Sequence, residues 1–243
     1  MFIFVRERII YADDMKKLVV LTGSGISAES GLKTFRESGG LWEDHDVMQV
    51  ASYEGWLADT ELVLRFYNER RAQLEKAEPN AGHYGLVDLE EYYDVQIITQ
   101  NVDNLHERAG SKKVLHLHGI LTQAKSTMDD SLVYEIGYKP LKMGDTCEKG
   151  HQLRPNIVWF GEAVPAIEEA AYLTSQADIL AVIGTSLVVY PAAGLLHYAP
   201  PGTSIYLIDP HPSFSHITKD VNVIAEKAGT GVKRLKEILI PEK

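Results

Sequence analysis

Short, almost continuously apolar runs recur along the chain, and polar stretches with helical periodicity separate them. Runs this short and rich in β-branched residues are typical of strands that are buried on both faces of a parallel sheet. Their alternation with helices predicts an α/β fold built on a doubly wound parallel sheet. We expect the strands at residues 18–22, 95–99, 114–118, 157–160, 179–183, 205–208 and 221–224.

Two segments, residues 33–80 and 122–155, interrupt this alternation. The first holds no convincing strand and one long predicted helix at residues 60–77, and the second is polar and contains several glycines. We expect both segments to be insertions that form a smaller lobe beside the sheet. The predicted organisation is a single domain, residues 1–243, whose sheet core spans about 15–32, 81–121 and 156–243.

The predicted helix at residues 60–77 carries a stripe of residues at helical spacing, namely Val63, Phe66, Tyr67, Arg70 and Leu74. Arg70 falls on this otherwise apolar stripe and should be buried, where a guanidinium needs an anionic partner. Tyr67 lies on the same face, so the phenol and the guanidinium form a fork that suits a carboxylate. An internal salt bridge to an Asp or Glu is the alternative, and the neighbouring Arg71 is expected to be solvated.

A glycine-rich stretch, residues 23–31, follows the first predicted strand. Its pattern Gly23-x-Gly25-x-x-Ala28 is typical of a turn between a strand and a helix, where glycine lets a pyrophosphate approach and the helix N-terminus supplies N–H groups. A plain tight turn is the alternative. The acidic residue that dehydrogenases place about 20 residues further on is missing, so an ordinary dehydrogenase is disfavoured. The loop that follows could instead close over a cofactor with Phe35, Arg36 and Trp42.

Two more polar stretches follow predicted strands. Gln100-Asn101-Val102-Asp103 comes after residues 95–99, and Gly184-Thr185-Ser186 comes after residues 179–183. Ligands of open α/β sheets bind at the carboxyl ends of the strands, so we expect these stretches at one site. Asn101 can pair with a carboxamide and Asp103 can accept from an amide or hydroxyl, while Asx turns are the alternative. The stretch from Gly184 suits a phosphate or ribose, or forms a plain turn.

Two histidines, His116 and His118, occupy alternate positions of the predicted strand at residues 114–118 and therefore share one face of it. His118 ends the strand before Gly119, where a reacting group could reach it. A neutral imidazole there is a natural general base near neutral pH. We expect His116 to be a hydrogen-bonded histidine of the core.

The segment at residues 154–162 is extended and apolar at its centre. Such a segment could pair with an extended peptide by β-addition. A strand of the core is the alternative.

Composition narrows the classes of partner and site. The net charge of −10 disfavours nucleic acid or an anionic membrane as the main partner. The single cysteine, Cys147, rules out an intramolecular disulfide and a four-cysteine zinc ribbon. No signal peptide or membrane-spanning run is evident, so we expect a cytoplasmic protein.

Taken together, these motifs resemble those of the sirtuin family of NAD-dependent protein-lysine deacylases, over nearly the whole chain. The resemblance implies a Rossmann-like NAD-binding core in which His118, Asn101 and Asp103 are catalytic. It implies cofactor contacts at Gly23, Ser24, Gly25, Ser27, Ala28, Phe35, Arg36, Trp42, Gln100, Asn101, Val102, Asp103, Gly184, Thr185, Ser186 and Ala228. It implies acyl-lysine contacts at Tyr67, Arg70, Val158, Phe160, Gly161 and Glu162.

The pair Tyr67-x-x-Arg70 resembles that of the sirtuin subgroup that removes succinyl and malonyl groups. The expected reaction consumes NAD, removes these groups from protein lysines and acetyl groups more weakly, and yields nicotinamide, O-acyl-ADP-ribose and free lysine. His118 would take a proton from a ribose hydroxyl. The alternatives are ADP-ribosyl transfer, NAD hydrolysis, or a catalytically silent NAD-sensing module.

The chain departs from the family pattern at several positions. Ser24 stands where the family usually has alanine, and Leu207 where a late strand commonly has the asparagine of the adenosine-ribose contact. The family's structural zinc needs two cysteine pairs, but only Cys147 is present. We therefore expect a lobe without zinc, packed by apolar residues such as Leu132, Val133, Tyr134 and Leu141.

Overall fold

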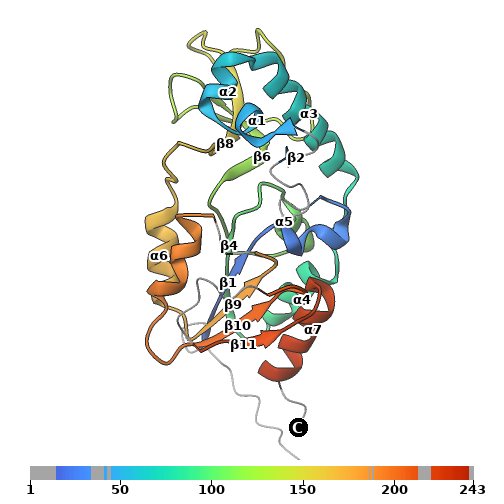
Figure 1. The fold of residues 1–243 in the computed structure, drawn as a ribbon, viewed down its shortest axis with the longest axis vertical. Coiled ribbons are helices and arrows are strands. Elements are labelled where there is room, and N and C mark those ends of the chain that lie inside the picture. The colour runs from blue at the N-terminus through green and yellow to red at the C-terminus, as the bar shows by residue number, and fades with distance from the viewer. Residues whose placement is uncertain are drawn as a thin grey trace, which may run out of the picture.

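A parallel sheet of six strands forms the centre of the larger lobe (Figure 1). The computed structural model describes residues 15–33, 41–42, 45–185, 187, 189–212 and 220–240. The strands are ordered β11-β10-β9-β1-β4-β5, with the bounds β1 Lys17–Thr22, β4 Asp94–Thr99, β5 Val114–His116, β9 Ile179–Ile183, β10 Ser204–Ile208 and β11 Asn222–Ile224. The predicted doubly wound α/β fold is confirmed.

The order of the strands places a switch point beside β1. This strand pairs in parallel with β4 on one side and with β9 on the other. The chain builds outward from β1 to β4 and β5, and then returns to build β9, β10 and β11 in the other direction. Open α/β sheets bind their ligands at the carboxyl ends of the strands at such a point.

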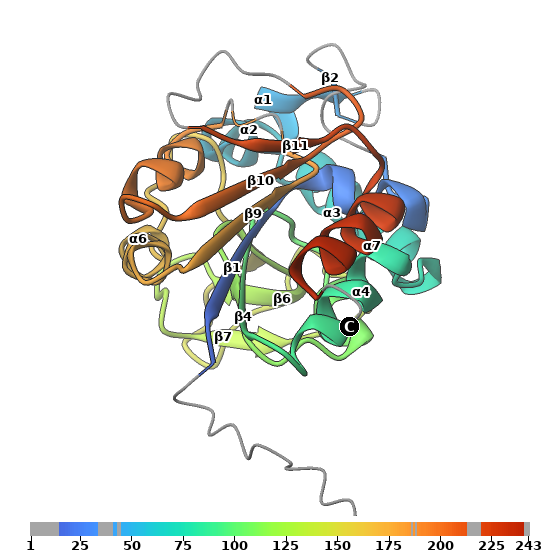
Figure 2. The same cartoon turned by 90° about the horizontal axis from the view of Figure 1, so that it is seen from below.

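Helices cover both faces of the sheet (Figure 2). One face carries α4 (Ala81–Leu89) and α7 (Ala228–Leu239), and the other carries α6 (Ile167–Ser175) and the 3-10 helix η5 (Ala192–Tyr198). Alternate residues of β1 enter opposite cores, with Leu18 and Val20 on the α4 side and Val19 and Leu21 on the α6 side. Burial on both faces explains why the strand is apolar at successive positions.

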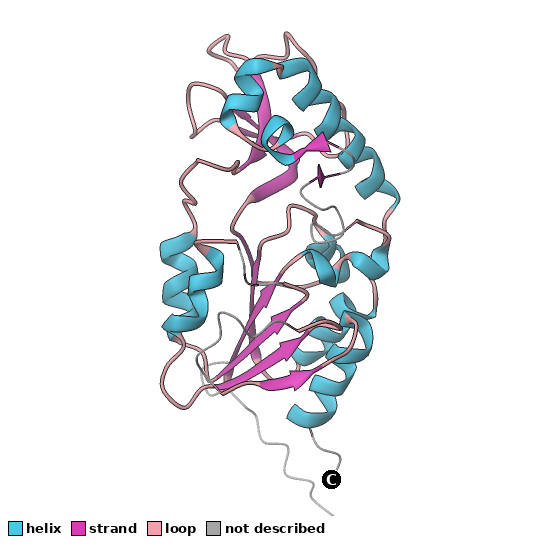
Figure 3. Cartoon of the chain, in the orientation of Figure 1, coloured by secondary structure: helices cyan, strands magenta, loops and turns pink. Residues whose placement is uncertain are grey.

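The two insertions form a smaller lobe beyond the carboxyl edge of the sheet (Figure 3). Its antiparallel sheet has the order β7-β6-β8 and packs against three helices around one apolar core. The elements are α1 Val47–Val50, α2 Tyr53–Ala58, α3 Thr60–Lys76, β6 Gly119–Ser126, β7 Val133–Glu135 and β8 Leu153–Ile157. A short hairpin of β2 (Leu41–Trp42) and β3 (His45–Asp46) precedes α1, and α5 (Leu105–Ala109) follows β4.

Two predicted elements are wrong. The strand expected at residues 157–160 ends at Ile157, because β8 belongs to the small antiparallel sheet and only an isolated bridge joins Phe160 to Ser52. The glycine-rich stretch itself forms two 3-10 turns, Ser24–Ile26 and Ala28–Ser30, and the described residues 23–33 contain no α-helix where one was expected to begin. The Gly25 N–H donates to the Gly184 carbonyl at 2.8 Å, which ties the turn to the neighbouring loop.

Two side chains of the small lobe also differ from expectation. Val133 is 44% exposed, since β7 alternates its faces and turns Tyr134 toward the core instead. Arg71, expected to be solvated, is 0% exposed. Its guanidinium donates to the Leu121 carbonyl at 3.3 Å and to the Asn68 side chain. Of the other residues expected to pack the lobe, Leu141 is buried and Leu132 packs against its core.

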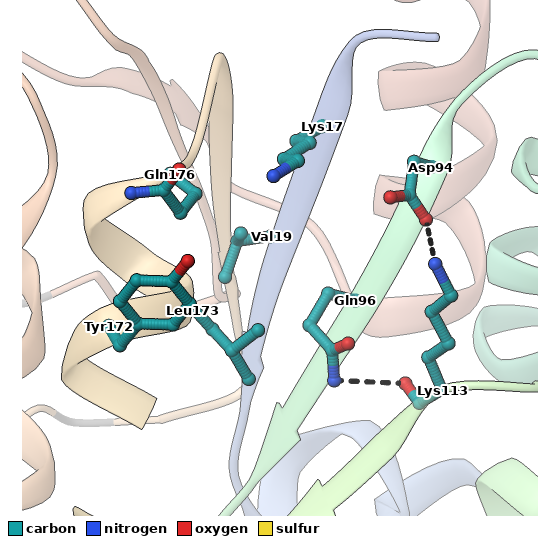
Figure 4. A pocket seen from close by; sticks show the side chains of 8 residues that line it. All are labelled: Lys17, Val19, Asp94, Gln96, Lys113, Tyr172, Leu173 and Gln176. Atoms are coloured by element: carbon teal, nitrogen blue, oxygen red, sulfur yellow. Dashed lines mark hydrogen bonds and ion pairs between the residues drawn. The ribbon is translucent and has the colours of Figure 1, made fainter. Parts of the chain in front are cut away.

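A pocket lies at the amino ends of β1 and β4, beside α6 (Figure 4). Lys17 and Gln96 line it, and Lys113 pairs there with Asp94 at 2.6 Å. This pocket is at the edge of the sheet opposite to the switch-point loops. Within the described ranges, no helix has both the length and the apolar character that crossing a membrane requires.

Candidate active site

The loops after β1 and β9 touch directly at the switch point. A Cβ added at Gly25 would lie 2.6 Å from the Gly184 Cα, and Gly184 itself has φ +61°. Both positions therefore require glycine, and the two backbones form a floor without side chains. Gln100, at the end of β4, donates from its side chain to the Thr185 hydroxyl at 3.0 Å. The structure thus brings the stretches starting at Gly23, Gln100 and Gly184 together, as the sequence predicted.

Asn101 and Asp103 meet on the hydroxyl of Ser27. The Asn101 side-chain amide donates to the Ser27 Oγ at 3.1 Å and to the Gly23 carbonyl at 3.2 Å. The Ser27 hydroxyl in turn donates to the Asp103 carboxylate at 3.0 Å. Both side chains are buried, at 8% and 7% exposed. Ser27 therefore fixes the amide and the carboxylate in one orientation beside the glycine floor.

Asp103 also forms the kind of local turn, an Asx turn, that the sequence offered as the alternative to a functional role. Its second carboxylate oxygen accepts from the Leu105 N–H at the start of α5, at 3.2 Å. Burial raises the pKa of Asp103 above its ordinary value, although the bonds from Leu105 and Ser27 oppose the rise. The carboxylate is thus an acceptor held rigidly from both sides.

His118 lies just beyond β5 and is only partly buried. Its Nδ1 is 2.9 Å from the Gln100 carbonyl. Because a carbonyl can only accept, Nδ1 carries the proton and the lone pair is on Nε2. Burial lowers the pKa of His118, although the hydrogen bond to Gln100 opposes this. A neutral imidazole with its lone pair on Nε2 is what a general base requires.

The turn after His118 depends on Gly119. This residue has φ +83°, and a Cβ there would lie 2.0 Å from the Asn156 carbonyl oxygen. No side chain fits this position, so the chain turns sharply from β5 into β6. The turn leaves His118 at the edge of the sheet.

His116 is the hydrogen-bonded core histidine that the sequence predicted. Its Nδ1 donates to the Asn101 carbonyl at 3.0 Å, and its Nε2 to the Glu107 carboxylate at 2.7 Å. Burial lowers the pKa of His116, but the bonds to Glu107 and Asn101 outweigh it and the net pKa is raised. His116 therefore holds the backbone of Asn101 in place.

Sequence reasoning missed a layer of polar residues beneath the site. Thr22 donates to Thr99 at 2.8 Å, and Thr99 accepts from the Asn101 N–H at 3.0 Å. The buried His106 lies 3.1 Å from the Thr22 hydroxyl through its Nε2. A signal was present, because both of the adjacent strands β1 and β4 end in threonine.

The segment after β8 runs beside His118. The Val158 N–H donates to the His118 carbonyl at 3.0 Å, and the Phe160 N–H to the Ala51 carbonyl at 2.8 Å. The Glu162 N–H donates to the Trp159 carbonyl at 3.0 Å. These three N–H groups bond within the protein, and β-addition of a peptide along this segment stays a prediction.

Tyr67 and Arg70 lie on the buried face of α3, as the helical spacing predicted, and are 0% and 8% exposed. The Tyr67 oxygen accepts from the Trp159 indole N–H at 2.9 Å. The Arg70 guanidinium lies 5.5 Å from the centre of the Phe66 ring. Burial raises the pKa of Tyr67 strongly, so this phenol stays neutral and can donate to an anion.

The remaining predicted contacts divide into two groups. Phe35, Arg36, Ser186 and the side chain of Trp42 lie outside the described residues. Ala228 is 4% exposed at the start of α7, packed near Gly82, and its contact with a cofactor stays a prediction.

Leu207 lies within β10, and Asp209 directly follows the strand. Leu207 is 2% exposed and belongs to the core on the α6 side. Asp209 follows the strand and is 4% exposed. Its carboxylate accepts from the His211 N–H at 2.8 Å. The expectation that Leu207 stands where the family has the asparagine of the adenosine-ribose contact stays a prediction.

The small lobe contains the single cysteine of the chain, so two cysteine pairs cannot form there, and a lobe without zinc stays a prediction. The thiol of this residue, Cys147, lies 3.5 Å from the Ser126 hydroxyl. Its backbone N–H donates to the His151 carbonyl at 2.9 Å. The described residues contain no cluster of three or more His, Cys, Asp and Glu that could hold a metal ion.

Comparisons with known proteins agree with this geometry. The profile of the Sir2 family matches residues 23–191. An NAD-dependent protein deacylase of Bacteroides thetaiotaomicron is 55% identical over 232 residues, which cover 93% of this chain and 99% of that protein. The structure of a Sir2 homologue with NAD is 36% identical, with a TM-score of 0.81 over 93% of this chain and 91% of that one. A Sir2 structure with a p53 peptide and NAD⁺ is 32% identical, with a TM-score of 0.75 over 93% and 95% of the two chains.

Proposed function

The chain belongs to the Sir2 family, and we propose that it removes succinyl and malonyl groups from protein lysines in preference to acetyl groups. Its activity as an NAD-dependent protein deacylase follows from its relatives. The preference for acyl groups that carry a carboxylate is the more specific part of this proposal. The observation that carries it is the buried pair of Tyr67 and Arg70 on α3.

The residues present at the switch point fit NAD. Gly25 and Gly184 leave a floor that any side chain would fill, and glycine in such a loop lets a pyrophosphate approach the backbone. Asn101 and Asp103 supply an amide and a carboxylate fixed by Ser27. When bound, NAD supplies a ribose carbon that becomes electrophilic as nicotinamide leaves. In this assignment Asn101 and Asp103 orient the nicotinamide side and its ribose.

His118 supplies the base and the neighbouring segment positions the acyl-lysine. The Nε2 lone pair of His118 takes a proton from a ribose hydroxyl, and the Gln100 carbonyl keeps Nδ1 protonated meanwhile. The segment at residues 158–162 lies against His118 through the Val158 N–H. The same segment contacts α3 through Trp159, whose indole N–H donates to the Tyr67 oxygen at 2.9 Å.

The environment of α3 suits an acyl group that ends in a carboxylate. The Arg70 guanidinium is 8% exposed and lies 5.5 Å from the centre of the Phe66 ring, so solvent would screen its attraction to an acyl carboxylate little. A hydrogen bond to a charged group contributes about 1.5–3 kcal/mol. An acetyl group offers no carboxylate, so only the dicarboxylic acyl groups would gain this term.

The test is the variant Arg70→Met, which keeps most of the length of the side chain and removes its charge. We expect kcat/KM for desuccinylation to fall by about 10–100-fold relative to deacetylation, because only the succinyl group loses a charged hydrogen bond. The control is Arg65→Met on the same helix, since Arg65 is exposed and its loss should leave the ratio unchanged. Equal losses on both substrates would show that Arg70 is not the carboxylate partner.

We further propose that the small lobe folds without zinc. The single cysteine supports this, and so does a set of hydrogen bonds within the lobe. Asn68 donates to the Leu141 carbonyl at 2.8 Å and accepts from the Leu141 N–H at 2.8 Å. The buried Arg71 also donates to Asn68. These bonds join α3 to the loop at Leu141, which carries Cys147 a few residues later.

A further inference from the structure

Trp159 connects the segment beside His118 to the helix that carries Tyr67. Its side chain is 1% exposed, and its indole N–H donates to the Tyr67 oxygen at 2.9 Å. The two rings are 6.3 Å apart and tilted by 37°. A buried indole N–H needs an acceptor, and here the acceptor is a side chain of the proposed acyl fork.

An ion pair fixes the orientation of this indole. The Arg154 guanidinium stacks 3.4 Å from the centre of the Trp159 ring and binds both oxygens of Glu162, at 2.7 and 2.9 Å. The same carboxylate accepts from the Trp159 N–H of the backbone at 2.8 Å. Arg154 is 4% exposed, so solvent screens these contacts little. The indole cannot swing away from Tyr67 without disturbing this pair.

The indole also determines whether the Tyr67 hydroxyl acts as a hydrogen-bond donor or acceptor toward a third group. A phenol oxygen has two lone pairs and a single proton. When Trp159 donates to one lone pair, the proton of Tyr67 points away from the indole and serves as a donor. Burial raises the pKa of Tyr67 and keeps that proton in place. Without the indole N–H, the hydroxyl could turn and offer a lone pair, which would repel a carboxylate.

We propose that Trp159 is a positioning residue for acyl selectivity, which holds the Tyr67 hydroxyl as a donor toward the carboxylate of a dicarboxylic acyl group. This inference rests on the function proposed above. It assigns selectivity to the segment that also bonds to the His118 backbone through Val158. One rigid segment thus positions both the catalytic histidine and the far end of the acyl pocket.

The test compares Trp159→Phe, which keeps an aromatic ring but removes the N–H donor, with the intact protein. We expect the ratio of kcat/KM for succinyl-lysine to that for acetyl-lysine to fall by about fivefold to tenfold, the size of one ordinary hydrogen bond. Trp56→Phe is the matched control, because Trp56 lies in the same aromatic cluster, 5.6 Å from Trp159. We expect that control to leave the ratio unchanged.

A double variant separates positioning from simple packing. If Trp159 acts through Tyr67, then Trp159→Phe combined with Tyr67→Phe should give the same ratio as Tyr67→Phe alone. Losses that multiply, or a Trp159→Phe variant that slows both substrates equally, would overturn the inference. If Trp159→Phe does not fold, a benzothienylalanine at position 159 removes only the N–H and is tested in the same way.

The outcomes distinguish this inference from the proposed function. If neither Arg70→Met nor Tyr67→Phe changes the succinyl-to-acetyl ratio, the proposed function is wrong and the inference falls with it. If both change the ratio while Trp159→Phe leaves it unchanged, the proposed function stands and only the role of Trp159 is overturned.

Discussion

In the proposed reaction, the protonation of His118 decides whether this residue can act as the general base. The Gln100 carbonyl fixes the proton on Nδ1, so Nε2 is the basic nitrogen. Burial lowers the pKa of His118 below its ordinary value of 6.5. A lowered pKa keeps the imidazole neutral at pH values where an exposed histidine would already be protonated.

The pH dependence of the reaction should report this shift. We expect the acid limb of kcat/KM to have an apparent pKa below 6.5, because the basic form is lost only when the pH falls through the lowered pKa of His118. We also expect His118→Ala to lower turnover by about 10²–10⁴-fold. Initial rates of deacylation across a pH series would measure the first effect. An acid limb above the ordinary pKa, or near-normal turnover of the variant, would contradict the assignment.

At the scale of residues, the positions of the polar groups in the site were easier to predict from the sequence than the hydrogen bonds that support them. Asn101 and Asp103 could be placed at one edge because they directly follow a strand. The support from Ser27, Thr22 and Thr99 depends on loops that only the fold brings together. Arg71 was expected to be solvated, because helical spacing alone does not show that the Leu121 carbonyl lies within reach.

At the scale of elements, the glycine floor between β1 and β9 leaves no room for a side chain. We expect Gly25→Ala to weaken NAD binding at least tenfold and to lower Tm, because its Cβ would lie 2.6 Å from the backbone of Gly184. A tenfold loss of affinity corresponds to about 1.4 kcal/mol of binding free energy. Calorimetric titration with NAD would measure the change.

Gly194→Ala is the control for this prediction. The nearest atom to a Cβ at Gly194 is 4.0 Å away, in ordinary van der Waals contact. We expect that variant to bind NAD as the intact protein does. If Gly25→Ala binds NAD equally well, the floor does not form the binding site.

The strands of the large sheet were predictable because burial on both faces leaves a continuous apolar run. The same signal was wrong for residues 157–160, where Trp159 packs among aromatic side chains of the small lobe and not within a sheet. An apolar run shows that a segment is buried, but not which partner it pairs with. The turn after β1 was misjudged for a related reason, since its Gly25 N–H bonds to a loop distant in sequence.

At the scale of the molecule, two lobes meet above the carboxyl edge of the sheet (Figure 1). The α/β core and the insertions were visible in the sequence as a break in the alternation of strands and helices. The antiparallel sheet of the small lobe was not, because β6 is partly polar, β7 is short, and β6 pairs with β8 across the intervening residues 127–152.

The stability of the small lobe should depend on Asn68 and not on a metal. We expect Asn68→Ala to lower the free energy of unfolding by about 1–3 kcal/mol, because the buried Arg71 and the Leu141 backbone lose their partner. Glu69→Ala, at an exposed neighbouring position, is the control. Treatment with a chelator should leave Tm unchanged. Thermal denaturation and elemental analysis test both statements, and a bound equivalent of zinc would refute the second.

The most direct test of the proposed activity is mass spectrometry of one lysine peptide, prepared in succinyl and acetyl forms and incubated with the protein with and without NAD. We predict NAD-dependent loss of the succinyl group that is faster than loss of the acetyl group. Acetyl loss that equals or exceeds succinyl loss would contradict the role of Tyr67 and Arg70. An added ADP-ribose on the peptide, with both acyl groups retained, would contradict deacylation itself and indicate ADP-ribosyl transfer.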